Sequence, residues 1–150
     1  MLNLGPIEDL KQKVISLEQL VNSALRDVFN QNEKLLIEIQ TQIQLYQKGQ
    51  TSKAITIVPS YAQSTIGKKK RKGDPFDRVT LKDTGALYSS VRFEALDDRL
   101  IVTTNVSYTK YLTAKYGPDI FGIQNLEMEN FLEKYYLPFY SESAKNLLFK

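Results

Sequence analysis

The sequence predicts an α+β fold with a long N-terminal helical arm, a small antiparallel sheet with helices packed on it, and a helical C-terminus. In the first third of the chain, apolar residues recur at the three- and four-residue spacing of one helical face. Two short runs of alternating apolar residues, between 91 and 104, flank the polar triplet 97–99 and predict a β-hairpin. With 150 residues, of which 42% are hydrophobic, the chain has the size of one globular domain.

The helical arm is expected to cover residues 1–49. Gly5-Pro6 suits a helix start, residues 30–33 have the pattern of a capping box that would interrupt the helix, and Gly49 suits its end. Because a helix of this kind is marginal in water by itself, we expect the arm to pack on another surface. Its candidate interface residues share one apolar stripe: Leu10, Val14, Leu17 and Val21.

The rest of the chain, residues 50–150, is expected to form the α+β body. Residues 54–58 are β-prone and residues 61–67 suit a short helix. The basic loop that follows, at 68–78, has few apolar residues, so we expect it to be exposed and mobile.

More regular elements are expected after this loop. Residues 79–81 predict a short strand, and residues 83–85 predict the start of a helix that leads into the hairpin. Ser107 suits the cap of a helix at 108–116. The C-terminal residues 125–148 again have helical spacing, and Pro138 is expected to divide them into two helical pieces.

The composition removes most catalytic chemistry. The chain has no cysteine and no histidine, so disulfides, thiol nucleophiles, the commonest general base and the usual transition-metal ligands are missing. Paired carboxylates such as Asp74 with Asp77, or Glu129 with Glu133, have the spacing of turns and of exposed helix faces. Residues 83–85 match the Asp-Thr-Gly signature of aspartic proteases, but the helical spacing after them fits a helix cap better. We therefore expect no enzyme activity, no cofactor and no metal.

The net charge of +3 is concentrated in one segment, since residues 51–82 hold eight Lys or Arg against two Asp or Glu. A run of five cations should project into solvent unless a polyanion or an acidic protein surface neutralises it. Two interpretations stay open, a solvated loop and a contact with DNA or an acidic partner. The candidate contact residues are Lys68, Lys69, Lys70, Arg71 and Lys72.

Tyrosine is the other enriched residue type, with nine in the chain. A nucleic-acid stacking platform would place tyrosines on exposed strands beside cations, whereas these lie at helical spacing with Phe and Leu. Core or protein interface is the better interpretation. The candidate interface residues in the C-terminal segment are Tyr135, Tyr136 and Phe139.

Residues 78–123 resemble neck and tail-completion proteins of tailed bacteriophages, a group that includes the head-to-tail joining and virion-morphogenesis families. The resemblance rests on a Thr-Gly-x-Leu-x-x-Ser element, a hairpin after it, and an aromatic-rich segment that ends at Gly117. Residues 61–66, with the Lys-rich run behind them, also resemble such proteins. The residues of the family-like motif are Asp83, Thr84, Gly85, Leu87 and Ser90.

This resemblance implies a structural virion protein of the neck or tail, assembled in the host cytoplasm. Such a protein forms a homo-oligomeric ring in the head-to-tail connector or completes the tail. Its implied partners are further copies of the chain and other phage neck, portal-adaptor or tail proteins, with packaged DNA passing through the channel. No membrane partner is expected, because no run approaches the length of a membrane span. The alternative from a different class is a small nucleic-acid-binding module with a basic arm.

Overall fold

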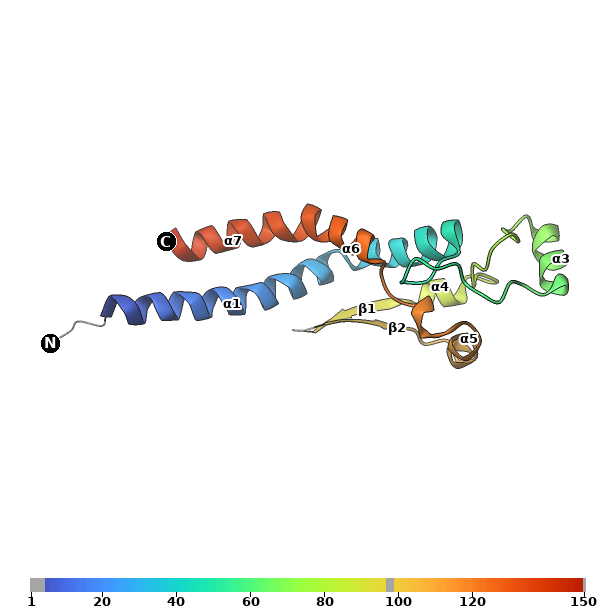
Figure 1. Ribbon diagram of the computed structural model, residues 1–150, viewed down its shortest axis with the longest axis horizontal. Helices are drawn as coiled ribbons and strands as arrows, with labels where there is room; N and C mark the ends of the chain where they lie inside the picture. Colours follow the sequence, from blue (N-terminus) through green and yellow to red (C-terminus); the bar gives the residue numbers. More distant parts are fainter. Residues whose placement is uncertain (1–4, 97–98, 150) are drawn as a thin grey trace.

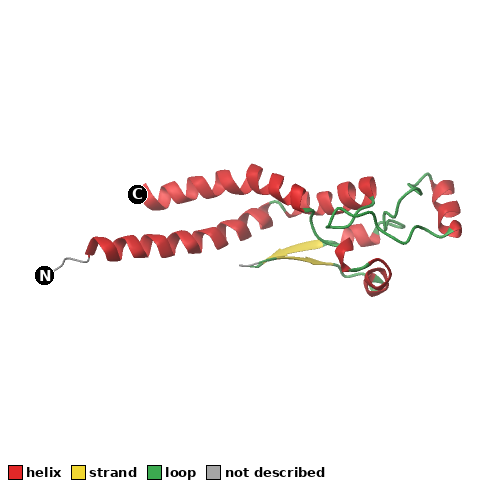
Figure 2. Ribbon diagram, in the orientation of Figure 1, coloured by secondary structure: helices red, strands yellow, loops and turns green. Residues whose placement is uncertain are grey.

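Two long helices at opposite ends of the sequence lie side by side and form an arm at one end of an elongated molecule (Figure 1). The computed structural model describes residues 5–96 and 99–149. The fold is α+β, as the sequence predicts, with helices in most of the chain and a two-stranded antiparallel sheet (Figure 2). In chain order the elements are α1 (Gly5–Gln31), α2 (Glu33–Glu38), the π-helix η1 (Ile39–Lys48), α3 (Gln63–Lys72), α4 (Ala86–Ser90), β1 (Arg92–Ala95), β2 (Leu100–Thr103), α5 (Thr109–Tyr116), the 3₁₀-helix η2 (Pro118–Ile120), α6 (Asn125–Phe131), the π-helix η3 (Leu132–Tyr136) and α7 (Leu137–Phe149).

The break predicted near residue 32 is confirmed, but no capping box forms there. Asn32 donates its side-chain amide to the carbonyl oxygen of Val28 (2.8 Å) rather than capping α2. The Glu33 carboxylate accepts a hydrogen bond from the backbone N–H of Phe93 (3.1 Å). Glu33 therefore ties the start of α2 to the first strand of the sheet. The predicted stop is also confirmed, because Gly49 ends η1 with φ +61°, a conformation that favours glycine.

The predicted hairpin is confirmed as β1 paired with β2, with Arg92 opposite Thr103 and Ala95 opposite Leu100. Along β1, Phe93 and Ala95 are buried while Arg92 and Glu94 are exposed, which is the alternation expected of a half-buried strand. The predicted turn includes Asp97 and Asp98, which lie outside the described residues.

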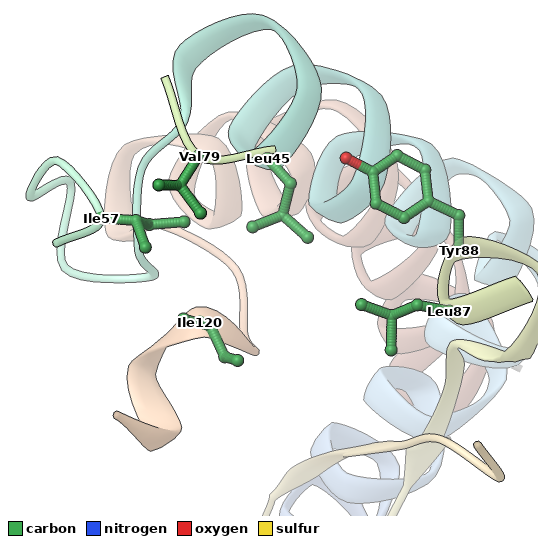
Figure 3. Packing of buried hydrophobic residues seen from close by; sticks show 6 residues of the cluster. All are labelled: Leu45, Ile57, Val79, Leu87, Tyr88 and Ile120. Atoms are coloured by element: carbon green, nitrogen blue, oxygen red, sulfur yellow. The ribbon is translucent and has the colours of Figure 1, made fainter. Parts of the chain in front are cut away.

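Two hydrophobic clusters hold the body and the arm together. One lies around η1, α4 and η2 and contains Leu45, Ile57, Val79, Leu87, Tyr88 and Ile120 (Figure 3). The other joins the arm helices to the sheet and contains Val28, Leu36, Val91, Phe93 and Phe131. Each cluster combines residues from before and after residue 49, so the end of the predicted arm is part of the core.

Two buried glutamines on η1, Gln40 and Gln44, form hydrogen bonds to the backbone of residues 120–124, and we call this pair the glutamine clamp. Gln40 donates its amide to the carbonyl oxygen of Ile120 (2.9 Å) and accepts from the N–H of Gly122 (2.6 Å). One helical turn later, Gln44 donates to the carbonyl oxygen of Gly122 (2.8 Å) and accepts from the N–H of Gln124 (2.8 Å). Both side chains are fully buried, so these four hydrogen bonds satisfy polar groups that water cannot reach.

The strand predicted at residues 79–81 is wrong. The N–H groups of Thr80 and Leu81 donate to the hydroxyl oxygen of Tyr61, at 2.9 and 3.1 Å, rather than to a neighbouring strand. Leu81 also has φ +57°, which a strand residue does not adopt. The β-prone residues 54–58 form only an isolated bridge between Gln50 and Thr56.

Two other expectations about helix ends are corrected. Pro138 does not divide the C-terminal segment, because α6, η3 and α7 follow one another without a gap and Pro138 is the second residue of α7. Pro138 lies just after a π-helical turn, whose altered hydrogen-bond spacing is where a residue without an N–H donor fits into continuous helix. Ser107 does not cap α5, whose first residue follows Tyr108 without a side-chain cap.

Candidate cleft beside the basic helix

The basic run is helical, which corrects the expectation of a loop at 68–72. It forms the second half of α3, and Gly73 ends the helix in the left-handed conformation with φ +74°. Cations in the last turn of a helix interact favourably with the negative end of its dipole. The run therefore stabilises the end of α3 by its position, although its charges repel one another.

The five cations have different surroundings. Lys69 is buried, donates to the carbonyl oxygen of Lys82 (2.7 Å) and lies over the ring of Tyr61, 5.1 Å from its centre. Lys70 lies over the ring of Phe76, at 4.7 Å.

Lys72 forms an ion pair with Asp83 (2.9 Å). The hydrogen bond from Lys72, helped by the attraction between the charges, lowers the pKa of the Asp83 carboxyl, and the same contact raises the pKa of Lys72. Lys68 and Arg71 are exposed, and no residue of the described ranges pairs with either of them by an ion pair or hydrogen bond. The run is thus one buried structural cation, Lys69, with surface cations on both sides of it.

A cleft of about 460 Å³ opens beside α3. Its wall on the α3 side is cationic, and its wall on the α5 side is aromatic and apolar. The segment from Leu81 to Thr84 lies between the two walls and includes the strained φ of Leu81. Residues that line the cleft are Tyr61, Thr65, Lys68, Lys69, Lys72, Leu81, Lys82, Asp83, Thr84, Tyr108, Leu112 and Tyr116.

The family-like motif begins in this cleft and ends in the core. Thr84 accepts a hydrogen bond from the N–H of Ala86 (3.3 Å) through its hydroxyl oxygen, and Gly85 precedes α4 with φ +90°. Leu87 is buried in the first cluster, and the Ser90 hydroxyl donates to the carbonyl oxygen of Leu87 (2.8 Å). Residues 83–85 therefore start a helix, as the sequence predicts.

The candidate interface residues lie on the arm and are not beside the basic run of α3. Leu10 and Val14 are exposed near the free end of α1, while Leu17 and Val21 are half-buried. The aromatic candidates Tyr135, Tyr136 and Phe139 pack against the second cluster, so this chain already covers part of them.

The sequence places Tyr108 and Tyr116 on one predicted helix as core or interface residues, but does not predict the cleft that they line. Leu112 and Tyr116 lie four residues apart on α5, and Tyr108, the residue before the helix, lies four residues before Leu112, so the spacing is a usable signal. No local pattern distinguishes the inward-facing Lys69 from the exposed Lys68. That difference depends on Tyr61 and Lys82, which only the tertiary fold brings close.

The lining of the cleft offers several kinds of binding group. It offers ammonium groups, hydroxyl groups and tyrosine rings, which recognise carboxylates, phosphates and flat or apolar groups. Over residues 5–96 and 99–149, no three acidic side chains come together as metal ligands. Among the helices that the structure describes, none combines the length and the apolar character of a membrane span.

Comparisons with protein-family models, curated proteins and solved structures give no match to this chain.

Proposed function

We propose that this chain is a structural virion protein of a tailed bacteriophage, which forms a ring in the neck or completes the tail. The observation that carries the proposal is the apolar surface at the free end of the arm. Seven large apolar residues there are exposed: Ile7, Leu10, Val14 and Ile15 on α1, and Leu147, Leu148 and Phe149 on α7. Exposed apolar surface on this scale is typical of sites that another protein covers.

The shape of the molecule supports an assembly role. The arm extends from one end of the body and α3 lies at the other, so distant surfaces are available to different neighbours (Figure 1). Contacts between unlike surfaces of identical copies generate a ring when the rotation closes. The motif at residues 83–90, which resembles phage neck and tail-completion proteins, supplies the viral context of the proposal.

Electron microscopy and phage genetics test this function. The purified chain is expected to form closed rings in negative stain, and phage lacking it is expected to accumulate heads that are not joined to complete tails. Normal particles without the protein, together with no ring from the purified chain, would contradict the proposal.

A second candidate function, a nucleic-acid-binding module, is favoured by the exposed cations Lys68 and Arg71 on α3. Contacts to phosphates release counterions, so binding of duplex DNA should weaken steeply between about 50 and 200 mM salt. Strong binding with that salt dependence by a chain that stays monomeric would favour this candidate over the ring.

A further inference from the structure

The two walls of the cleft carry different chemistry at matching helical spacing. On α3, Lys68 and Lys72 are one turn apart, and both line the cleft. On α5, Leu112 and Tyr116 are likewise one turn apart on the facing wall. A ligand that fills this cleft therefore needs both anionic and apolar groups.

Asp83 already shows that the cationic wall accepts a carboxylate. Its carboxylate lies 2.9 Å from the ammonium of Lys72, with the two side chains 82% and 55% exposed. An ion pair this exposed contributes little to folding and exchanges readily with other carboxylates. Lys68 has no such partner within the described ranges, so the wall can accept at least one more anion.

The outer face of the C-terminal helix has the complementary chemistry. Leu126 and Leu137 are 65% and 50% exposed, and Glu129 and Glu133 lie exposed between them. Lys134 is the cation on this face, and its ammonium lies over the ring of Tyr135, at 5.3 Å. Two apolar side chains thus flank two carboxylates along continuous helix.

The spacing of the charges also matches. Glu129 and Glu133 are four residues apart, as are Lys68 and Lys72, and the lysine pair spans about 6 Å along the axis of α3. Leu126 and Leu137 lie before and after the two carboxylates, so apolar side chains flank the carboxylates where they meet the lysines.

We propose that the cleft of one copy binds the outer face of the C-terminal helix, Leu126 to Leu137, of a second copy. Glu129 and Glu133 of the second copy pair with Lys68 and Lys72. Figure 1 places α3 at the end of the molecule opposite to the termini and α6 between α3 and the free end of the arm. The cleft and this helix face are therefore unlike surfaces, and a contact between them that repeats from copy to copy is heterologous, of the kind that builds rings. This inference rests on the proposed function and names the surfaces that its ring would use.

Charge reversal in two separate variants tests the contact. One variant carries Lys68→Glu with Lys72→Glu, and the other carries Glu129→Lys with Glu133→Lys. All four side chains are exposed, so both variants are expected to fold with the circular dichroism of the wild type. In analytical ultracentrifugation, each variant alone should self-associate at least about tenfold more weakly than the wild type, because like charges then face each other.

An equal mixture of the two variants is the decisive sample. In the mixture, the acidic helix face of the first variant meets the basic cleft of the second. The basic helix face of the second variant likewise meets the acidic cleft of the first. The mixture should therefore recover self-association to within about threefold of the wild type. Glu38→Lys, which changes an exposed carboxylate on α2 outside both surfaces, is the control and should associate like the wild type.

A single substitution gives an independent readout. Asp83→Asn removes the carboxylate that pairs with Lys72 and would compete with a carboxylate of the second copy. This variant should therefore strengthen self-association by about threefold. The same strengthening should disappear when Lys72→Glu is present in the same chain.

The outcomes of these experiments distinguish a failure of the cleft contact from a failure of the proposed ring function. If the wild type forms rings but neither double variant weakens association, or the mixture restores nothing, the contact is wrong and the proposed function stands. If Lys68→Glu with Lys72→Glu abolishes DNA binding while self-association is unchanged, the cleft is a nucleic-acid site and the contact is overturned. If the wild type stays monomeric up to about 1 mM, where a contact of millimolar Kd is half occupied, both are overturned.

Discussion

Lys69 has a structural role that the neighbouring cations of the basic run do not share. Its ammonium is 2.7 Å from the carbonyl oxygen of Lys82 and 3.5 Å from the hydroxyl of Thr80, beside the ring of Tyr61. A buried ammonium is tolerated only with such partners. Lys69 therefore fixes α3 on the body, and this placement leaves Lys68 and Lys72 at the cleft.

Tyr88 is the residue with the most perturbed environment. Its hydroxyl donates to the carbonyl oxygen of Thr80 at 2.5 Å, and burial raises the pKa of Tyr88 far above its usual value. An unfolded tyrosine ionises near pH 10 while the folded Tyr88 stays neutral, so the unfolded state loses the proton first. Above about pH 10 the free energy of unfolding should fall, by up to about 1.4 kcal/mol per pH unit from this group.

Urea unfolding of the wild type and of Tyr88→Phe, measured from about pH 8 to 11, checks this effect. The phenylalanine variant should lose stability less steeply above pH 10. Tyr136 retains a smaller effect in both proteins, because burial raises the pKa of its hydroxyl too. Tyr111→Phe, at a 67% exposed position, should keep the wild-type slope. Equal slopes for wild type and Tyr88→Phe would contradict the assignment.

At the scale of elements, the glutamine clamp decides how η1 holds the chain after η2. In Gln44→Leu, the carbonyl of Gly122 and the N–H of Gln124 lose their partners. Leaving two such groups unpaired away from water should lower the free energy of unfolding by about 2–4 kcal/mol. The matched control is Gln42→Leu, an exposed position on the same helix that should change stability by less than about 0.5 kcal/mol. Similar losses in both variants would show that the clamp is not the cause.

Helix ends provide a second pair of matched positions. Gly49 and Gly73 both have left-handed φ values, +61° and +74°. A Cβ at Gly49 would lie 2.8 Å from Cβ of Arg78, whereas a Cβ at Gly73 meets nothing within 4 Å. Gly73→Ala should therefore cost only the conformational strain of about 1 kcal/mol. Gly49→Ala should cost about 1–3 kcal/mol more, because Arg78 or the backbone has to shift.

Chemical denaturation of the two alanine variants measures this difference directly. An equal loss in both would mean that the close approach of Arg78 to Gly49 does not constrain the fold. The hydrogen bond from Nε of Arg78 to the carbonyl oxygen of Tyr46 (2.8 Å) explains why that side chain cannot simply move away.

The elements that the sequence predicts well are those specified by nearby residues. The alternation in β1 and the apolar period of α1 depend only on neighbours along the chain, and both elements form where expected. The predicted strand at 79–81 fails because its N–H groups bond to Tyr61, about twenty residues away. The sequence does not predict the cleft for the same reason, since only the tertiary fold brings residues of α3 and α5 to its walls.

At the scale of the whole molecule, the chain is too extended to bury all of its apolar residues within one copy. The second cluster covers the base of the arm, where Phe29 stacks on Phe131 with ring centres 5.5 Å apart. Toward the free end, the apolar residues of α1 become exposed, from the buried Val28 to Leu10 at 62%. This gradient means that the base of the arm stabilises the monomer, while its end is available to a partner.

Substitution at the end of the arm separates these two roles. Leu10→Gln with Val14→Gln replaces exposed side chains by a residue of good helix propensity, so the free energy of unfolding should change by less than about 0.5 kcal/mol. If the arm end contacts a partner as the proposed function requires, the number of complete particles or rings should fall in electron micrographs. Gln12→Ser with Gln19→Ser, on exposed polar positions of α1, should assemble normally.

Unchanged assembly of the Leu10 and Val14 variant would show that the exposed end of the arm has no partner. Loss of folding would instead show that it packs within the monomer. Because the charge-reversal variants change no residue of the exposed arm end, the two experiments report independently on two different surfaces.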